Sequence, residues 1–274
     1  MDNLKDLKYA QQSERQKLDV YFPANSTGPR PVILFLHPGG FTRGSKDMVK
    51  PYLNLILLRG YVVVSANYRL ADEARFPAQI HDAKAAVRWI RTNASLYNFN
   101  SEKIAAWGVS AGGIFAALLG TTPDVKKLED LTMGNPELSS RVSAVVAIIT
   151  PFDFINMDPQ LISLGKKPIH DNESSGESQV IGGLISKYPD RCKAISPMTY
   201  ISSESSPFYL QHGTADEIVP YLQSSNFAEK LITAIGKEKV DFNLIENANH
   251  FDQIHSAPDN INRALDFLDR FWES

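Results

Sequence analysis

The chain has 274 residues, of which 43% are hydrophobic and 22% are charged, and its formal net charge is -3. This composition is typical of one large globular domain, and the charge gives no electrostatic reason to expect nucleic acid or an anionic membrane as a partner. Cys192 is the only cysteine, which excludes an intrachain disulfide and argues against a cysteine-based metal site.

The chain start does not resemble a secretion signal. Residues 1–6 lack the apolar core of a signal peptide, and the longest apolar stretches are too short to span a bilayer. We therefore expect a cytoplasmic protein with no membrane partner. Secretion is the alternative if a signal segment has been removed, and the sequence leaves the oligomeric state open between monomer and dimer.

Short apolar runs alternate with longer segments of helical periodicity. The expected strands are residues 17–22, 32–36, 61–66, 104–107, 144–149, 208–210 and 240–245. The expected helices are residues 46–59, 77–90, 114–119, 220–235 and 260–272, and Ser45 is the expected N-cap of the first. Runs that are apolar at every position are typical of strands buried on both faces, so this alternation predicts a mostly parallel central sheet with helices on both faces.

One segment breaks the alternation. Residues 151–200 contain several prolines and only short periodic pieces, and they are too many for a plain loop. In a parallel α/β sheet, ligands bind at the carboxyl ends of the strands. We therefore predict a single domain over residues 1–274, with a small cap inserted at about 151–200 over the active-site face.

The pentapeptide Gly-Val-Ser-Ala-Gly at residues 108–112 lies between an apolar run and a helix-forming run. Strand, Gly-x-Ser-x-Gly and helix is the arrangement of a nucleophile elbow. In such a sharp turn Gly108 and Gly112 nearly touch, which only residues without a side chain allow. The turn would expose the Ser110 hydroxyl above the sheet. A plain glycine turn that opens a helix is the alternative.

A serine hydroxyl needs a base to become a nucleophile, and the base needs a carboxylate to orient it. In this kind of fold the partners follow the serine in the order acid, then histidine. Asp216 lies just after the strand at 208–210 and is the predicted acid. Glu217 is its nearest rival, and an Asp turn that leads into a helix is the structural alternative.

Of the six histidines, His250 alone follows the acid at the end of a strand, and it is the predicted base. His255 is the fallback. His37 precedes a glycine loop and is interpreted as its scaffold, and His212 as a brace for the acid loop. The remaining two are His81, in a predicted helix, and His170, in the cap.

An oxyanion hole needs backbone N–H groups directed at the developing alkoxide. The N–H of Ala111, at a helix N-terminus, is one predicted donor. The loop His-Pro-Gly-Gly at residues 37–40 follows a buried strand. Pro38 has no N–H, so Gly39 and Gly40 are the other predicted donors. The alternative is an ordinary Pro-Gly-Gly turn.

Two further features look structural. Arg69 ends a strand and Asp82 lies on the next helix, and we expect them to form an ion pair that braces the loop beneath the site. Four phenylalanines are predicted either to line an acyl pocket or to belong to the core: Phe41, Phe115, Phe152 and Phe154.

Three stretches, residues 76–82, 86–90 and 107–113, resemble the α/β-hydrolase esterases. The chain is most similar to the hormone-sensitive-lipase-like carboxylesterases, and within them to the branch of bifunctional feruloyl and acetyl xylan esterases. The resemblance covers about residues 18–272. It implies the α/β-hydrolase fold. It also implies the following site residues: Ser110 as nucleophile, Asp216 as acid, His250 as base, and Gly39, Gly40 and Ala111 as oxyanion donors.

One loop departs from the family pattern. The usual His-Gly-Gly-Gly-Trp reads His-Pro-Gly-Gly-Phe here, at residues 37–41. The latter two glycines are the usual donors, so Pro38 leaves the hole intact, whereas Phe41 in place of tryptophan alters one pocket wall.

These observations predict a serine carboxylesterase that acts through an acyl-enzyme and needs no cofactor and no metal. The expected partner is a small-molecule ester with a short, acetyl-type acyl group, and the resemblance points to acetylated or feruloylated carbohydrates. Two alternatives stay open. One is an amide hydrolase of the formamidase type, which the relative turnover of esters and formyl amides would distinguish. The other is an inactive hydrolase-fold binding protein, which commonly lacks the serine or the histidine.

Overall fold

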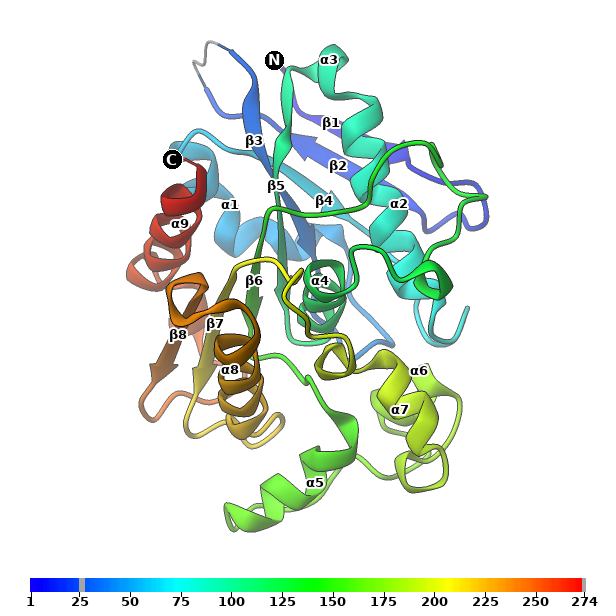
Figure 1. The fold of residues 1–274 in the computed structure, drawn as a ribbon, viewed down its shortest axis with the longest axis vertical. Coiled ribbons are helices and arrows are strands. Elements are labelled where there is room, and N and C mark those ends of the chain that lie inside the picture. Colours follow the sequence, from blue (N-terminus) through cyan, green and yellow to red (C-terminus); the bar gives the residue numbers. More distant parts are fainter. Residues whose placement is uncertain (25–27, 273–274) are drawn as a thin grey trace.

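The computed structural model describes residues 1–24 and 28–272. In this part of the chain, eight strands form one sheet in the order β1-β2-β4-β3-β5-β6-β7-β8 (Figure 1). The strands are β1 (Leu4–Lys8), β2 (Lys17–Tyr21), β3 (Arg30–Leu36), β4 (Val62–Ala66), β5 (Phe99–Val109), β6 (Ala144–Ile148), β7 (Phe208–Gly213) and β8 (Val240–Ile245). β2 pairs antiparallel with β1 and β4, and the other pairs are parallel, which confirms the predicted sheet.

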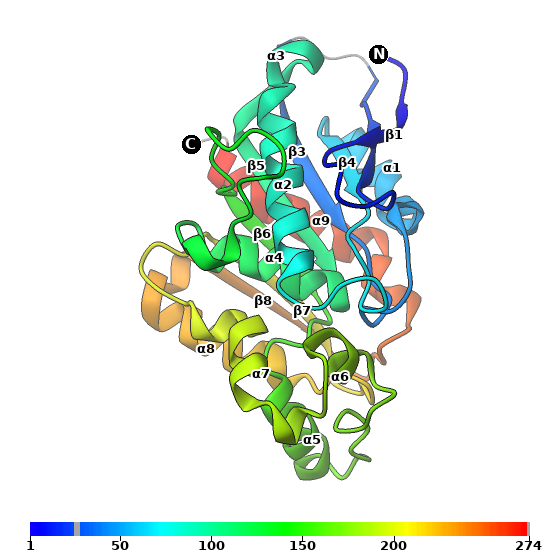
Figure 2. The same cartoon turned by 90° about the vertical axis from the view of Figure 1, so that its right-hand side faces the viewer.

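Helices cover both faces of this sheet. They are α1 (Lys50–Leu58), α2 (Ala78–Thr92), α3 (Ala94–Tyr97), α4 (Ala111–Thr121), α5 (Phe154–Ser163), α6 (Gly176–Ile181), α7 (Pro189–Ile195), α8 (Leu222–Ile235) and α9 (Pro258–Trp272). Side chains of α1 and α9 belong to one hydrophobic cluster, and those of α2, α4 and α8 belong to the other. The sheet is therefore the middle of three layers (Figure 2).

The apolar runs became strands because both of their faces are covered. β4 and β6 are buried at every position, and so are residues 32–36 of β3. β1 was not predicted from the sequence. Its residues, Leu-Lys-Asp-Leu-Lys, are mostly exposed at the sheet edge, and they become a strand through pairing with β2.

The segment expected as one helix over residues 46–59 begins differently. A 3-10 turn (Lys46–Val49) precedes α1, and the Ser45 side chain accepts a hydrogen bond from the Asp47 N–H at its start. Pro51 lies in the first turn of α1, where a residue without an N–H loses no intrahelical hydrogen bond. The predicted cap by Ser45 is thus confirmed, although it belongs to the short turn rather than to α1.

The segment between β6 and β7 carries α5, α6 and α7. These helices lie together beyond the carboxyl ends of the parallel strands, at the lower end of both views (Figures 1 and 2). This is the segment predicted as a cap, and we keep that name for residues 151–200. Across residues 1–24 and 28–272, no helix combines the length and the apolar character needed to cross a membrane.

The predicted ion pair between Arg69 and Asp82 is confirmed. Arg69 Nη2 lies 2.8 Å from Asp82 Oδ1, and the Arg69 backbone N–H donates to Oδ2 at 2.8 Å. Gln16 Nε2 also donates to Oδ1, at 2.7 Å. Because the Asp82 carboxylate is fully buried, these donors replace the water that it lost. They tie α2 to the segment that follows β4.

Candidate active site

Ser110 lies at the turn between β5 and α4, with a φ of 51° and a ψ of -121°. Its backbone N–H donates to the carbonyl of Ile148 at 2.8 Å. A Cβ atom on Gly108 would lie 2.3 Å from the carbonyl oxygen of Gly112, and one on Gly112 would lie 2.1 Å from that of Leu36. No side chain fits at those distances, so the predicted close approach of the two glycines is confirmed.

The serine begins a chain of hydrogen bonds. Ser110 Oγ lies 3.0 Å from His250 Nε2, and His250 Nδ1 lies 2.7 Å from Asp216 Oδ2. A carboxylate accepts but cannot donate, so Nδ1 carries the proton and Nε2 is free to accept from the serine hydroxyl. The structure thus brings together the three side chains that the sequence predicted as nucleophile, base and acid.

The Asp216 carboxylate is buried and held by several donors. Its Oδ1 accepts from the N–H groups of Ile218 and Val219 at 2.9 and 2.8 Å. Burial alone would raise its pKa, but the hydrogen bonds from His212 and His250 outweigh that effect and hold the pKa well below the usual range. Asp216 therefore stays ionised beside His250. The rival acid, Glu217, is exposed.

The other two histidines of this region support loops. His212 Nε2 donates to the carbonyl of Val219 at 2.9 Å, and Nδ1 accepts from Ser224 Oγ at 2.7 Å, so the predicted brace of the acid loop is confirmed. His255 Nε2 donates to the carbonyl of Asn249 at 2.9 Å. The fallback base thus holds the backbone just before His250 instead of contacting the serine.

The three predicted oxyanion donors line the same cleft as Ser110 and His250. Gly39 and Gly40 follow β3 with φ values of 136° and 57°, a region that favours glycine. Ala111 is the first residue of α4, where the N–H has no partner within the helix. Among the described residues, no acceptor engages these three N–H groups. They remain available to a substrate oxygen.

His37 is buried and holds the glycine loop, as predicted. Its ring stacks on Tyr68 with centroids 4.2 Å apart, and Nδ1 donates to the carbonyl of Pro38 at 2.8 Å. The Tyr68 hydroxyl donates to the His37 carbonyl at 2.8 Å, and the Arg15 guanidinium donates to the carbonyl of Gly44. Burial lowers the pKa of His37 to about 3.

This buried histidine predicts a loss of stability in acid. The pKa of His37 is about 3 in the folded chain and about 6.5 when unfolded, so between these values only the unfolded state binds its proton. Stability that is present above pH 6.5 is therefore lost as the pH falls toward 3, by up to about 1.4 kcal/mol per pH unit from this one group. Urea unfolding at pH 7, 6, 5 and 4 measures that slope.

The His37→Asn variant serves as the control, since asparagine does not titrate. The variant loses the ring stacking and is less stable throughout, so the slope and not the level is compared. Below pH 6, we expect the free energy of unfolding of the variant to fall by about 1.4 kcal/mol less per pH unit than that of the wild type. Equal slopes in the two proteins would show that His37 is not the group responsible.

The cleft above Ser110 has a volume of about 370 Å³. Phe41 is among its lining residues, and its ring packs edge-on against Phe115 and Phe154 with centroids 5.8 and 5.6 Å away. Phe152 stacks on Phe227 at 4.1 Å. Of the four phenylalanines predicted as pocket or core, Phe115, Phe152 and Phe154 therefore belong to the core, and Phe41 links the core to the cleft.

The sequence interpretation missed three cap residues that reach this site. Lys166 Nζ donates to the carbonyl of Asp216 at 2.6 Å, and His170 Nε2 donates to the carbonyl of Ile218 at 2.8 Å. Glu177 lines the cleft itself. No local pattern marks these residues, because each contact joins segments that are far apart in the chain.

Within the described ranges, no cluster of His, Cys, Asp and Glu side chains could hold a metal ion.

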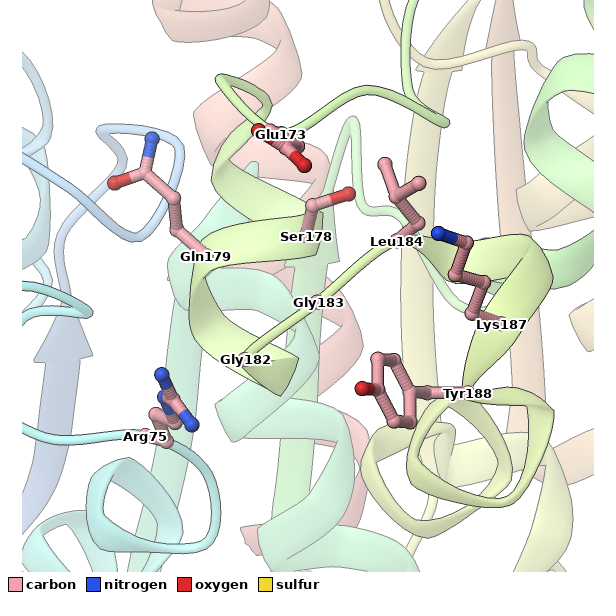
Figure 3. A pocket seen from close by; sticks show the side chains of 9 residues that line it. All are labelled: Arg75, Glu173, Ser178, Gln179, Gly182, Gly183, Leu184, Lys187 and Tyr188. Carbon is pink, nitrogen blue, oxygen red and sulfur yellow. The ribbon is translucent and has the colours of Figure 1, made fainter.

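A second hollow, of about 350 Å³, lies on the cap beside α6 (Figure 3). Its charged lining side chains are Arg75, Glu173 and Lys187, and all three are exposed. None of the predicted catalytic residues lines it. This hollow is therefore separate from the cleft above Ser110.

The chain is similar in sequence to known ester hydrolases. A probable carboxylic ester hydrolase of Mycobacterium tuberculosis, LipM, is 28% identical over 260 residues, which cover 92% of this chain and 57% of LipM. The chain thus spans a little over half the length of LipM.

Solved structures match over nearly the whole chain. A truncated form of a carbohydrate esterase from gut microbiota is 29% identical with a TM-score of 0.89, and the match covers 100% of this chain and 97% of that one. A bifunctional GH43-CE protein of Bacteroides eggerthii is 30% identical with a TM-score of 0.88, covering 98% of this chain and 38% of that one. Together with the sheet order, these neighbours identify the α/β-hydrolase fold.

The family model named BD-FAE matches residues 18–231. That range includes the elbow at Ser110, the glycine loop after β3 and the predicted acid, Asp216. It covers well over half of the sequence, so the predicted family resemblance is confirmed and the chain belongs to the BD-FAE family.

Proposed function

We propose that this chain is a serine carboxylesterase that hydrolyses short-chain, acetyl-type esters, with acylated carbohydrates as its substrate class. The observation that carries the proposal is the hydrogen-bonded chain Ser110–His250–Asp216 next to unpaired backbone N–H groups. A base within 3.0 Å of a serine hydroxyl, itself oriented by a buried carboxylate, is the arrangement that acyl transfer requires.

The reaction follows from this arrangement. Ser110 Oγ attacks the ester carbonyl while His250 Nε2 takes its proton, and Asp216 stabilises the imidazolium that forms. The N–H groups of Gly39, Gly40 and Ala111 stabilise the negative oxygen of the tetrahedral intermediate. His250 then gives its proton to the leaving alcohol, and an acyl-enzyme remains on Ser110. Water, activated by His250, hydrolyses it by the reverse steps.

The size of the site supports a small acyl group. The cleft volume of about 370 Å³ lies near the lower end of the range for small-molecule sites. Phe41 is fully buried against the core, which limits extension of the cleft beneath the glycine loop. The carbohydrate part of the proposal is supported by the full-length match to a carbohydrate esterase from gut microbiota.

Initial rates on p-nitrophenyl acetate, butyrate and octanoate, on methyl ferulate and on acetylated xylo-oligosaccharides test the proposal. We expect turnover of p-nitrophenyl acetate to exceed that of octanoate by at least tenfold, since a cleft of about 370 Å³ has to hold the alcohol part as well as the acyl chain. Faster turnover of octanoate would contradict the short-chain part. Hydrolysis of formyl amides without hydrolysis of any ester would contradict the esterase assignment and favour an amide hydrolase.

A further inference from the structure

The cap places one carboxylate in the catalytic cleft. Glu177, the second residue of α6, lines the cleft together with Ser110 and His250, and its side chain is 11% exposed. A negative charge near an oxyanion hole is unfavourable for the developing alkoxide unless something compensates it. Its presence in this place therefore needs an explanation.

Glu177 is held close to the glycine loop. The preceding residue, Gly176, packs so tightly on this loop that a Cβ atom there would lie 1.9 Å from the carbonyl oxygen of Gly40. No other residue type fits at that distance, so α6 rests directly against one of the predicted oxyanion donors. A substrate bound with its carbonyl at this loop would lie beside the Glu177 side chain.

His170 compensates the charge of Glu177. Its Nδ1 lies 3.2 Å from Glu177 Oε2, while its Nε2 lies 2.8 Å from the carbonyl of Ile218. Both ring nitrogens thus face acceptors, which only the imidazolium satisfies. Burial lowers the pKa of His170, but the hydrogen bond and charge of Glu177, the carbonyl of Ile218 and the charge of Asp158 together outweigh it, and the pKa lies above its usual value. The buried pair is therefore close to neutral as a whole.

No donor from the described residues contacts the other carboxylate oxygen, Oε1. Across residues 1–24 and 28–272, His170 is the one side chain that pairs with Glu177. Oε1 is not among the buried side-chain atoms that lack a partner, so it is open to solvent in the cleft. A ligand that displaces the water there has to replace the hydrogen bond that the water made. Since His170 already neutralises the charge, a neutral hydroxyl suits this oxygen better than a cation does.

We propose that Glu177 Oε1 accepts a hydrogen bond from a hydroxyl group on the alcohol part of the substrate, so that the site selects esters of polyols such as sugars. An acetyl group carries no hydroxyl, so the donor belongs to the alcohol. This inference rests on the proposed esterase function and adds to it the residue that distinguishes a sugar ester from a simple ester. Glu177 is thereby a specificity residue, and His170 is the positioning residue that holds it.

Two acetyl esters that differ only in the alcohol test the proposal. One is p-nitrophenyl acetate, whose alcohol has no further hydroxyl, and the other is a methyl xyloside carrying one acetyl group. We expect Glu177→Gln to lower the ratio of kcat/KM for the sugar ester over the aryl ester by about tenfold or more. The amide is neutral, and with its oxygen turned to the His170 donor it presents an NH₂ group to the substrate hydroxyl in place of a charged acceptor. Glu177→Asp keeps the charge and should lose less.

Glu173→Gln is the matched control. Glu173 lies in the same cap segment, is exposed and lines the second hollow rather than the cleft (Figure 3). The same change of charge at this position should leave the ratio unaltered. Thermal unfolding of the variants shows whether the cap still folds.

The outcomes separate the possibilities. An unchanged ratio in Glu177→Gln, or an equal loss on both esters, overturns the proposal, the latter because it indicates that Glu177 only holds the cap. Acetylcholine, an acetyl ester of a cationic alcohol, is assayed beside these two esters. A selective loss of activity on acetylcholine instead of the sugar ester also overturns the proposal, in favour of a cation site. If the wild type hydrolyses neither acetyl ester, the proposed function fails and this inference falls with it.

Discussion

Ser110→Ala is expected to lower kcat for p-nitrophenyl acetate by on the order of 10⁴-fold or more. The alanine removes the oxygen that carries the acyl group in the proposed mechanism, and neither His250 nor the predicted oxyanion donors can replace it. The fold should survive, because Ser110 adopts its φ of 51° in a turn that Gly108 and Gly112 make possible. Initial rates measure the loss, and circular dichroism with thermal unfolding measures the integrity of the fold.

Ser101→Ala provides the matched control. Ser101 lies at the opposite end of β5, and its hydroxyl contacts Glu102 rather than any residue of the cleft. This variant should keep the wild-type rate. Retention of most activity by Ser110→Ala would contradict the assignment of the nucleophile, and mass spectrometry after reaction with a phosphonylating reagent would then locate the serine that reacts.

Asp216→Asn is expected to lower kcat by roughly 10³- to 10⁴-fold. The carboxylate accepts from His250 Nδ1 at 2.7 Å and thereby keeps Nε2 free to take the serine proton. An amide can place its NH₂ group toward Nδ1, which favours the opposite tautomer and disables the base. The backbone N–H groups of Ile218 and Val219, which donate to the Asp216 carboxylate, would also lose a charged acceptor. Because this loss can lower stability, thermal unfolding is measured beside the rates.

Glu217→Gln is the control for this substitution, because it makes the same chemical change one residue further along. Glu217 is exposed, whereas Asp216 is fully buried against His250. We expect the Glu217 variant to retain its activity. A large loss in Glu217→Gln together with activity in Asp216→Asn would exchange the two assignments.

Asp216 Oδ2 is shared by two histidines. His250 Nδ1 lies 2.7 Å from it and His212 Nε2 lies 3.2 Å from it. The His212 ring is in turn fixed by Ser224 and by the carbonyl of Val219. Asp216 is thus held from the side of β7 and α8 as well as by His250. This explains how a carboxylate with no solvent exposure remains ionised.

The elbow was predictable because its constraint is local. A sharp turn between a strand and a helix brings Gly108 into contact with Gly112. Because a side chain does not fit there, both positions are glycine. The apolar strands were predictable for a similar reason, since a strand covered on both faces has to be apolar at every position. The chain order of serine, acid and histidine then left one good candidate for each partner.

Other features depended on contacts between distant parts of the chain. β1 is polar in pattern and becomes a strand only by pairing with β2. His255 stayed a fallback base until the structure showed that its ring contacts the Asn249 carbonyl, whereas that of His250 contacts Ser110. The same holds for Phe115, which could have faced either the cleft or the core.

The cap shows most clearly which features the sequence predicts and which depend on the tertiary structure. Its insertion over the carboxyl ends of the strands follows from the broken alternation of residues 151–200, which the sequence displays. That Glu177 enters the cleft, that His170 pairs with it and that Lys166 reaches the acid loop are results of tertiary packing alone. The sequence by itself determined the fold class and the candidates for nucleophile, acid and base, because local geometry and chain order restrict those residues. Which further side chains meet in the cleft was decided only by tertiary structure, because such contacts depend on how separate segments pack and leave no periodic pattern in the chain.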